Sequence, residues 1–181
     1  MKAFLIISFL FPLCTWAVVM EPKAGFLKFH ATASPGALSI NGTGDFPSGK
    51  IEYSESGDQI EISGALKMKI DSFKTGISIR DSHLKDKYLE ASKYPEALLI
   101  IPKQKISKNG GDFHGDLVLH GTRHTVAGKA EVSEIEKGRK SVRASFPIRL
   151  EDHSIEIPKF AGVSVSNDVR VETEFELGTA Q

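Results

Sequence analysis

Strict two-residue alternation over long stretches constrains the fold of this chain more than any other feature. Within residues 60–70, apolar side chains such as Ile60 and Met68 occupy even positions, and polar side chains lie between them. Residues 169–177 repeat the pattern, with Phe175 among the apolar positions. Successive side chains of a strand point to opposite faces, so these segments predict long antiparallel strands with one apolar and one charged face.

Shorter alternating segments recur between Asn-Gly and Lys-Gly turn signals, and together they predict roughly eight or more strands. Gly64 lies on the apolar face of a predicted strand, where we expect a bulge or bend. A single open sheet of this length would expose two edges, so the simplest all-β architecture is a closed antiparallel barrel. A β-sandwich remains the alternative.

Residues 80–92 interrupt the β pattern. Leu84, Tyr88 and Leu89 have the spacing of one helix face, and Pro95 prevents continuation of a helix. We therefore expect a single short helix across an end or side of the sheet, with Ser78 or Asp81 as its cap.

The start of this helix carries a compact polar group formed by Arg80, Asp81 and His83. One interpretation is a contact at the barrel rim for a ligand head group, made by Arg80 and His83. The other is a helix cap with an ion pair to the sheet.

Residues 1–17 have the pattern of a secretory signal peptide, with a positive charge, an apolar run and a small final residue. The run is shorter than the roughly 20 residues of a membrane-spanning helix. Its removal would leave residues 18–181 as one domain without Cys14 and Trp16, the only Cys and Trp in the chain. Export without cysteine fits a bacterial periplasm, which is the location we predict.

Charge and composition exclude several classes of partner. The chain has 23 basic and 23 acidic residues and no basic stripe, so we expect no nucleic-acid binding. Its 3 tyrosines form no aromatic girdles, so we expect a protein that does not span a membrane. An edge strand could support a homodimer, although nothing in the sequence demands one.

The histidines raise the question of a metal-dependent enzyme. His114, His120 and His124 lie close in sequence and could bind zinc or copper. However, strand parity directs His114 and His120 toward solvent, and no Cys or acidic residue at ligand spacing completes the set. A nucleophile motif of the G-x-S-x-G type is also lacking. We therefore expect no metal, no cofactor and no enzymatic activity.

The inward apolar positions are the features with functional content. The predicted pore residues are Leu66, Met68, Ile70, Leu98, Ile100, Leu117, Leu119, Phe146, Ile148, Val171 and Phe175. Small residues on these faces, such as Gly115 and Gly128, would reduce the bulk at the centre. A small barrel either fills its centre or keeps a cavity for one ligand, and the sequence leaves both outcomes open.

Several motifs resemble those of the YceI-like family over residues 50–177. They are Phe73-Lys74-Thr75-Gly76, Arg80-Asp81-Ser82-His83-Leu84, Tyr94-Pro95 and the stretch from Gly115 to Thr122. The segments around Phe146 and Val169 are compatible with the closing strands of that family. The resemblance implies a lipocalin-like extended barrel, exported to the periplasm, that binds isoprenoids or other long-chain amphiphiles and has no enzymatic activity.

The leading hypothesis is therefore a periplasmic carrier for a polyisoprenoid or fatty-acid-like lipid, with the head group near Arg80 and His83. A second hypothesis is a filled-core, non-enzymatic module that acts on a periplasmic stress or redox partner. The third is the metal-dependent enzyme described above.

Overall fold

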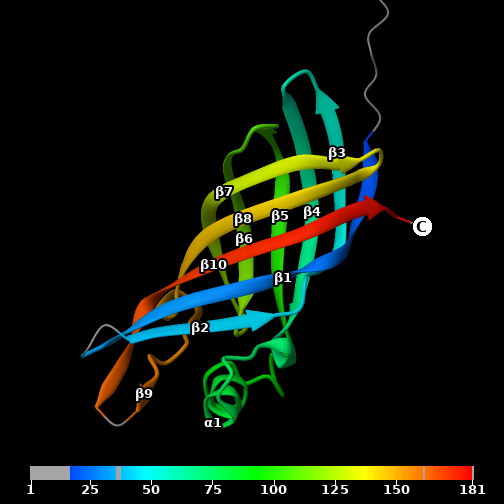
Figure 1. Cartoon of the computed structure of the whole chain (residues 1–181). Coiled ribbons are helices and arrows are strands. Elements are labelled where there is room, and N and C mark those ends of the chain that lie inside the picture. Colours follow the sequence, from blue (N-terminus) through cyan, green and yellow to red (C-terminus); the bar gives the residue numbers. More distant parts are fainter. Residues whose placement is uncertain (1–16, 36–37, 161, 181) are drawn as a thin grey trace, which may run out of the picture.

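Antiparallel strand pairing runs around the whole molecule and closes on itself (Figure 1). The computed structural model describes residues 17–35, 38–160 and 162–180. Within these residues the barrel has eight strands: β1 (Val18–Ser34), β3 (Ser48–Ser56), β4 (Gln59–Lys69), β5 (Glu96–Ser107), β6 (Gly111–Leu119), β7 (Thr122–Glu136), β8 (Arg139–Arg149) and β10 (Val163–Thr179). They pair in that order, and β10 pairs again with β1. The predicted closed antiparallel barrel is confirmed, and the β-sandwich alternative is wrong. The expected signal segment lies, except for Ala17, outside the described residues and stays a prediction.

Strand β1 changes partner along its length. Residues 18–20 pair with β3, whereas residues 27–33 pair with β2 (Leu38–Gly44). The other edge of β1 stays on β10, and β10 is itself extended by β9 (Lys159–Phe160). Strands β2 and β9 therefore lengthen the wall at the lower end of the barrel (Figure 1).

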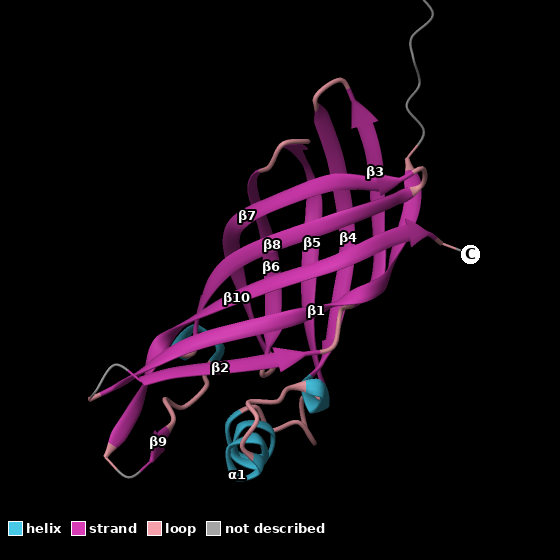
Figure 2. Cartoon of the chain, in the orientation of Figure 1, coloured by secondary structure: helices cyan, strands magenta, loops and turns pink. Residues whose placement is uncertain are grey.

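The expected helix forms at this lower end, with different bounds (Figure 2). The 3-10 turn η1 (Ile70–Ser72) precedes α1 (Ser78–Ser82), which continues into a wider helical turn with π spacing, η2 (His83–Tyr88). The 3-10 turn η3 (Glu151–His153) lies after β8. Among the described helices, none has the length and apolar character needed to cross a bilayer.

The predicted capping of this helix by Ser78 or Asp81 is wrong. Its N-cap is Ile77, whose side chain makes no capping hydrogen bond. Asp81 instead accepts a hydrogen bond from the backbone N–H of Thr75 at 2.6 Å. The chain turns at Gly76, where φ is 81°, and this turn brings Thr75 back to the carboxylate. We call residues 70–95, which contain η1, α1 and η2, the lid.

Strand β5 presents the opposite face to the one predicted. Leu98 pairs with Lys67 and Ile100 with Asp116, so both share the outer face with charged residues. Leu99 pairs with Leu66 and Leu117 on the inner face. Residues 97–101 are all apolar, so alternation carries no information there, and only the pairing with neighbouring strands decides the face. The predicted inward placement of Leu98 and Ile100 is wrong.

The bend expected at Gly64 is present. The register between β4 and β5 shifts between Ile62 and Gly64, and Gly64 has a φ of 149°. Beyond the shift, the side-chain amide of Gln104 donates to the carbonyl of His114 at 2.7 Å and accepts from its N–H at 3.0 Å. This side chain replaces a pair of ladder hydrogen bonds where β5 and β6 diverge.

Candidate ligand-binding cavity

The upper half of the barrel is filled by its own side chains. Ile60 and Ile106 face each other across β4 and β5 and are 0% and 3% exposed. Phe113 is also buried, and its ring meets the edge of the Phe146 ring with centroids 5.8 Å apart. These contacts form a solid core above Phe146.

An ionic cluster closes the upper end. Lys140 of β8 reaches across the barrel to Glu55 of β3, with Nζ 2.8 Å from Oε1, although these strands are not neighbours in the sheet. Tyr53 donates a hydrogen bond to Oε1 of Glu55 at 2.6 Å, and Lys108 binds the other carboxylate oxygen. Hydrogen bonds from Lys108, Lys140 and Tyr53 lower the pKa of Glu55 to about 2, and burial raises that of Tyr53.

The lower half contains a cavity of about 630 Å³ with a predominantly apolar wall. Eight of the predicted pore residues line it, namely Leu66, Met68, Leu117, Leu119, Phe146, Ile148, Val171 and Phe175. Ile70 is buried at 1% exposure in the core but does not border the cavity. The sequence left open whether the centre of the barrel is filled or holds a cavity. The structure shows both, because the upper half is packed and the lower half is hollow.

Some residues that line the cavity were not among the predicted pore residues. Ala31 and Ala33 of β1 and Ala97 of β5 line the cavity, and their small side chains leave space within the wall. The alternation of Leu27, Phe29, Ala31 and Ala33 was a usable signal for this face. In contrast, Gly115 permits close approach of strands, since an added Cβ would lie 2.9 Å from the carbonyl oxygen of Ile100.

The apolar face of the helical segment covers the cavity from below. Leu84, Tyr88 and Leu89 border the cavity, and Tyr88 and Leu89 are buried. These are the residues whose spacing predicted a helix. The amphipathic pattern therefore arises from covering a hollow interior, together with packing on the core.

Arg80 and His83 both lie at the mouth of the cavity. The Arg80 guanidinium donates to Oγ1 and to the carbonyl oxygen of Thr75, at 2.7 and 2.8 Å. Thr75 in turn donates to Asp81, and these hydrogen bonds lower the pKa of the Asp81 carboxyl. Arg80 is thus held in position by the chain before α1, while His83 is exposed. Their contact with a head group stays a prediction.

The lid is fastened to the barrel through histidines. Nε2 of His120 lies 2.6 Å from Oε2 of Glu90, and Nδ1 of His120 lies 3.2 Å from the carbonyl oxygen of His153. His153 is 1% exposed, and its Nδ1 lies 3.1 Å from the carbonyl oxygen of Thr122. Burial lowers the pKa of His153.

The three histidines considered for a metal site have separate environments. His120 contacts Glu90 and is only 12% exposed, contrary to the solvent-facing position expected for it, because it follows the end of β6 with a φ of 51°. His124 lies 3.5 Å from Asp152, and His114 is exposed. The described part of the chain contains no group of three or more His, Cys, Asp or Glu side chains arranged to hold a metal ion.

Two of the motifs that carry the family resemblance meet where His120 fastens the lid to the barrel. We call this contact the lid anchor. The Tyr94 ring packs on the edge of His120 with centroids 4.8 Å apart. A Cβ at Gly121 would lie 2.6 Å from the Tyr94 ring, so this position requires glycine for space as well as for its φ of 74°. The Tyr94-Pro95 and His120-Gly121 segments thus form one joint between lid and barrel.

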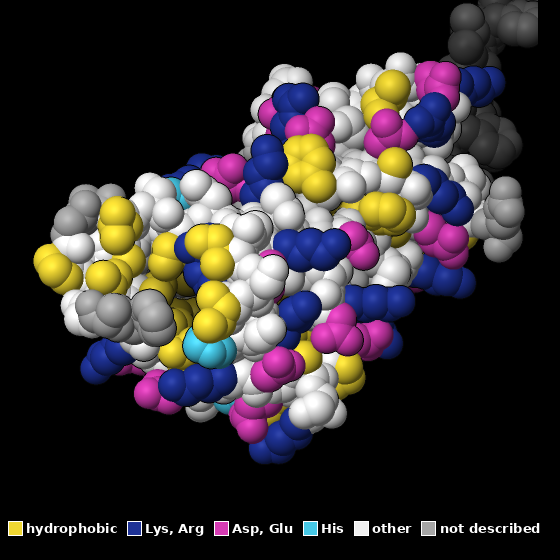
Figure 3. Space-filling model, turned by 60° about the horizontal axis from the view of Figure 1, so that its bottom comes forward, with side chains coloured by type: hydrophobic (Ala, Val, Ile, Leu, Met, Phe, Trp, Pro, Cys, Tyr) yellow, Lys and Arg dark blue, Asp and Glu magenta, His cyan; other side chains and the backbone are white. Residues whose placement is uncertain are grey.

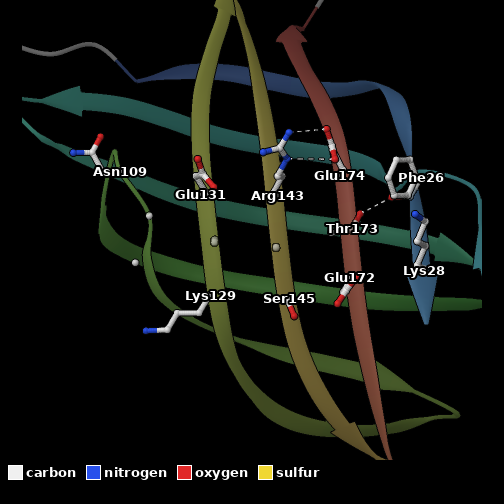
Figure 4. Close-up of a pocket in the computed structure, with 14 residues that line it drawn as sticks. Phe26, Lys28, Asn109, Lys129, Glu131, Arg143, Ser145, Glu172, Thr173 and Glu174 are labelled. Atoms are coloured by element: carbon white, nitrogen blue, oxygen red, sulfur yellow. Dashed lines mark hydrogen bonds and ion pairs between the residues drawn. The ribbon is translucent and has the colours of Figure 1, made fainter. Parts of the chain in front are cut away.

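A second hollow of about 490 Å³ lies on the outer wall (Figure 4). Its rim carries charges of both signs, and Arg143 already pairs with Glu174, with Nε 3.3 Å from Oε2. Thr173 donates to the carbonyl oxygen of Phe26 at 2.9 Å. The lining carries three cations, Lys28, Lys129 and Arg143, and three carboxylates, Glu131, Glu172 and Glu174, so this hollow is a charged surface and not a counterpart of the apolar cavity.

Solved structures with the same fold come from several bacteria. A polyisoprenoid-binding domain from Saccharophagus degradans, implicated in plant cell wall breakdown, is 18% identical, with 90% of this chain and 99% of that chain covered and a TM-score of 0.67. BcnA from Burkholderia cenocepacia is 16% identical, with 83% and 95% covered and a TM-score of 0.65. The Campylobacter jejuni YCEI protein is 22% identical, with 78% and 86% covered and a TM-score of 0.58.

No curated protein matches this chain in sequence. The family model for the YceI-like domain, however, matches residues 19–177, which include all the barrel strands except the ends of β1 and β10. The resemblance inferred from the motifs is therefore confirmed. The chain belongs to the YceI-like family.

Proposed function

We propose that this protein is a non-enzymatic carrier that holds a polyisoprenoid or another long-chain lipid in the lower half of its barrel and works in the periplasm. The observation that carries the proposal is the apolar cavity of about 630 Å³, which ends at Phe146 and opens beside the lid. Ligand pockets usually measure roughly 300–1,000 Å³, so the cavity has the size of a binding site.

The wall suits a hydrocarbon chain. Each methylene moved from water into such a cavity gains about 0.8 kcal/mol, so a tail of about ten methylenes gains roughly 8 kcal/mol before the cost of ordering. The packed core at Phe146 and the ionic cluster at Glu55 block the upper end. A lipid therefore enters tail first from below, and its head group stays near Arg80 and His83.

Two further observations support lipid binding and export. The structurally similar domain from Saccharophagus degradans is described as polyisoprenoid-binding. Residues 1–17 have the pattern of a signal peptide, and the remainder of the chain contains no cysteine. Cell fractionation with N-terminal sequencing tests the location, because an uncleaved cytoplasmic protein would contradict it.

The binding proposal is tested by native mass spectrometry of gently purified protein and by uptake of prenyl lipids. We expect a bound lipid, and we expect Ala33→Phe to block uptake by filling the cavity. Ala127→Phe is the matched control, because Ala127 is exposed on β7 and the same change there adds bulk outside the barrel. Repeated recovery of empty protein that takes up no prenyl lipid would contradict the carrier proposal and favour a non-enzymatic module that acts on a partner protein.

A further inference from the structure

We propose that the mouth of the cavity is a membrane-docking surface, which places the lower end of the barrel on an anionic phospholipid bilayer. The inference extends the proposed function, since it names the surface from which a carried lipid would be loaded or to which it would be delivered.

The distribution of exposed apolar side chains carries this inference. Among the described residues, the three most exposed large hydrophobic side chains are Ile79, Leu38 and Ile77, at 64%, 54% and 50%. All three border the same cavity, although Leu38 belongs to β2 and the others to the lid. Figure 3 shows hydrophobic side chains gathered around a hollow on the lower end of the molecule. Exposed apolar residues that cluster instead of being scattered mark an interaction surface.

Charge favours a lipid surface over a protein partner. The chain as a whole is neutral, with 23 basic and 23 acidic residues. The lid carries five cations against four carboxylates, namely Lys74, Arg80, Lys85, Lys87 and Lys93 against Asp71, Asp81, Asp86 and Glu90. The residues that border the cavity itself include three cations, Lys67, Arg80 and Lys159, and no carboxylate. Asp81 is hydrogen-bonded to Thr75, and Glu90 contacts His120. An apolar rim with surrounding lysines has the composition of surfaces that lie in the interface of an anionic membrane.

This surface differs from an isolated exposed apolar patch because it is continuous with the cavity. Ile77 and Ile79 are exposed to solvent on one side and border the apolar interior on the other. When these side chains enter the acyl region, a lipid tail moves from bilayer to cavity without crossing water. Desolvation of a whole tail is thereby avoided.

The test is flotation of the full chain with vesicles of phosphatidylglycerol and phosphatidylcholine, compared with phosphatidylcholine alone. We expect binding to the anionic vesicles, weakened by salt. The double variant Ile77→Ser/Ile79→Ser should lower the vesicle partition coefficient at least about tenfold. Ile135→Ser is the matched control, because Ile135 is 48% exposed but lies near the other end of β7.

The charge contribution is tested with Lys74→Gln/Lys87→Gln, which should weaken partition roughly 25-fold at low salt, at about fivefold per lysine. Lys105→Gln/Lys137→Gln removes the same charge from exposed positions outside the lid and should have a smaller effect. Wild-type protein that stays in solution, or an Ile77→Ser/Ile79→Ser variant that floats as well as wild type, would overturn the inference. So would a wild-type homodimer in sedimentation that the Ile77→Ser/Ile79→Ser variant dissociates, since these isoleucines would then form a dimer interface.

A parallel uptake assay with prenyl lipid dispersed in detergent separates this inference from the proposed function. Uptake without vesicle binding defeats docking and leaves the carrier proposal standing. Vesicle binding without uptake supports docking and contradicts the carrier proposal. Because both isoleucines are exposed, the variants should retain the thermal unfolding midpoint of the wild type, which excludes misfolding as the cause.

Discussion

The two ends of the barrel use the same strands in opposite ways. At the upper end, the interior is packed and an ion pair between Glu55 and Lys140 spans the barrel. At the lower end, alanines in the wall and the helical lid that covers the opening leave a cavity whose rim exposes isoleucines. Stability and binding are thus divided between the two halves, so substitutions of one type should have different effects at each end.

The largest expected difference comes from one substitution made at both ends. Ile60→Ala removes a side chain that is 0% exposed in the packed half and should lower the free energy of unfolding by about 3–4 kcal/mol. Ile79→Ala, at a position 64% exposed, should change it by less than about 0.5 kcal/mol. Urea denaturation measures both, and equal losses would mean that the lower end is as tightly packed as the upper.

Breaking the ionic cluster should have the next largest effect. Glu55→Gln leaves the ammonium of Lys140, whose side chain is 12% exposed, without its main counter-charge. We expect a loss of about 2 kcal/mol in the free energy of unfolding, below the value for a fully buried pair because Glu55 is partly exposed. Glu61→Gln is the control, since Glu61 pairs with a Lys103 that is 72% exposed. A variant as stable as wild type would show that the cluster closes the end without stabilising it.

The two ends should also respond to acid in different pH ranges. The folded state holds the pKa of Glu55 at about 2 against an ordinary 4.5, so its contribution is present above pH 4.5 and is lost as pH falls toward 2. Burial lowers the pKa of His153 below its ordinary 6.5, so protonation favours the unfolded state and the contribution of His153 is lost as pH falls below 6.5. The lid anchor should therefore loosen first.

Hydrogen exchange at pH 7, 5.5 and 4.5 checks this order. Amides of the lid and of η3 should lose protection before those around Glu55. His153→Asn should remove the difference between pH 7 and 5.5, because asparagine keeps a donor near the Thr122 carbonyl without titrating. Simultaneous loss at both ends would contradict separate anchors.

The smallest effect is expected on the outer wall. Lys69 is exposed on β4, so Lys69→Ala should change the free energy of unfolding by less than about 0.5 kcal/mol and leave lipid uptake intact. Thermal unfolding and the uptake assay measure this, and a clear loss of uptake would indicate that the outer wall takes part in binding.

Much of the fold could be predicted because alternation is a local signal. Strands β4 and β10 separate apolar from charged positions so clearly that their inner faces, including Met68 and Phe175, follow from the sequence. Strand β5 shows the limit of this signal. Where Leu98 and Leu99 are equally apolar, only cross-strand pairing distinguishes the wall from the interior.

The cavity itself was beyond sequence reasoning. Ile60 and Leu66 lie on the same face of β4, yet one lies in the packed half and the other borders the cavity. What separates them is the set of side chains that other strands bring opposite each, such as Ile106 in the first case and Ala31 among the wall residues in the second. Likewise, Glu90 and His120 are 30 residues apart, and only folding makes them an anchor.

By itself, the sequence determined a set of long antiparallel strands, a helical interruption and a resemblance to the family, because side-chain alternation and short motifs depend on neighbours along the chain. The tertiary structure alone decided that the barrel is solid above Phe146 and hollow below it, and that the lid is held by His120. The volume of the cavity and the closure of the barrel depend on which side chains pack against each other across the interior. These contacts are made between residues that are distant in sequence.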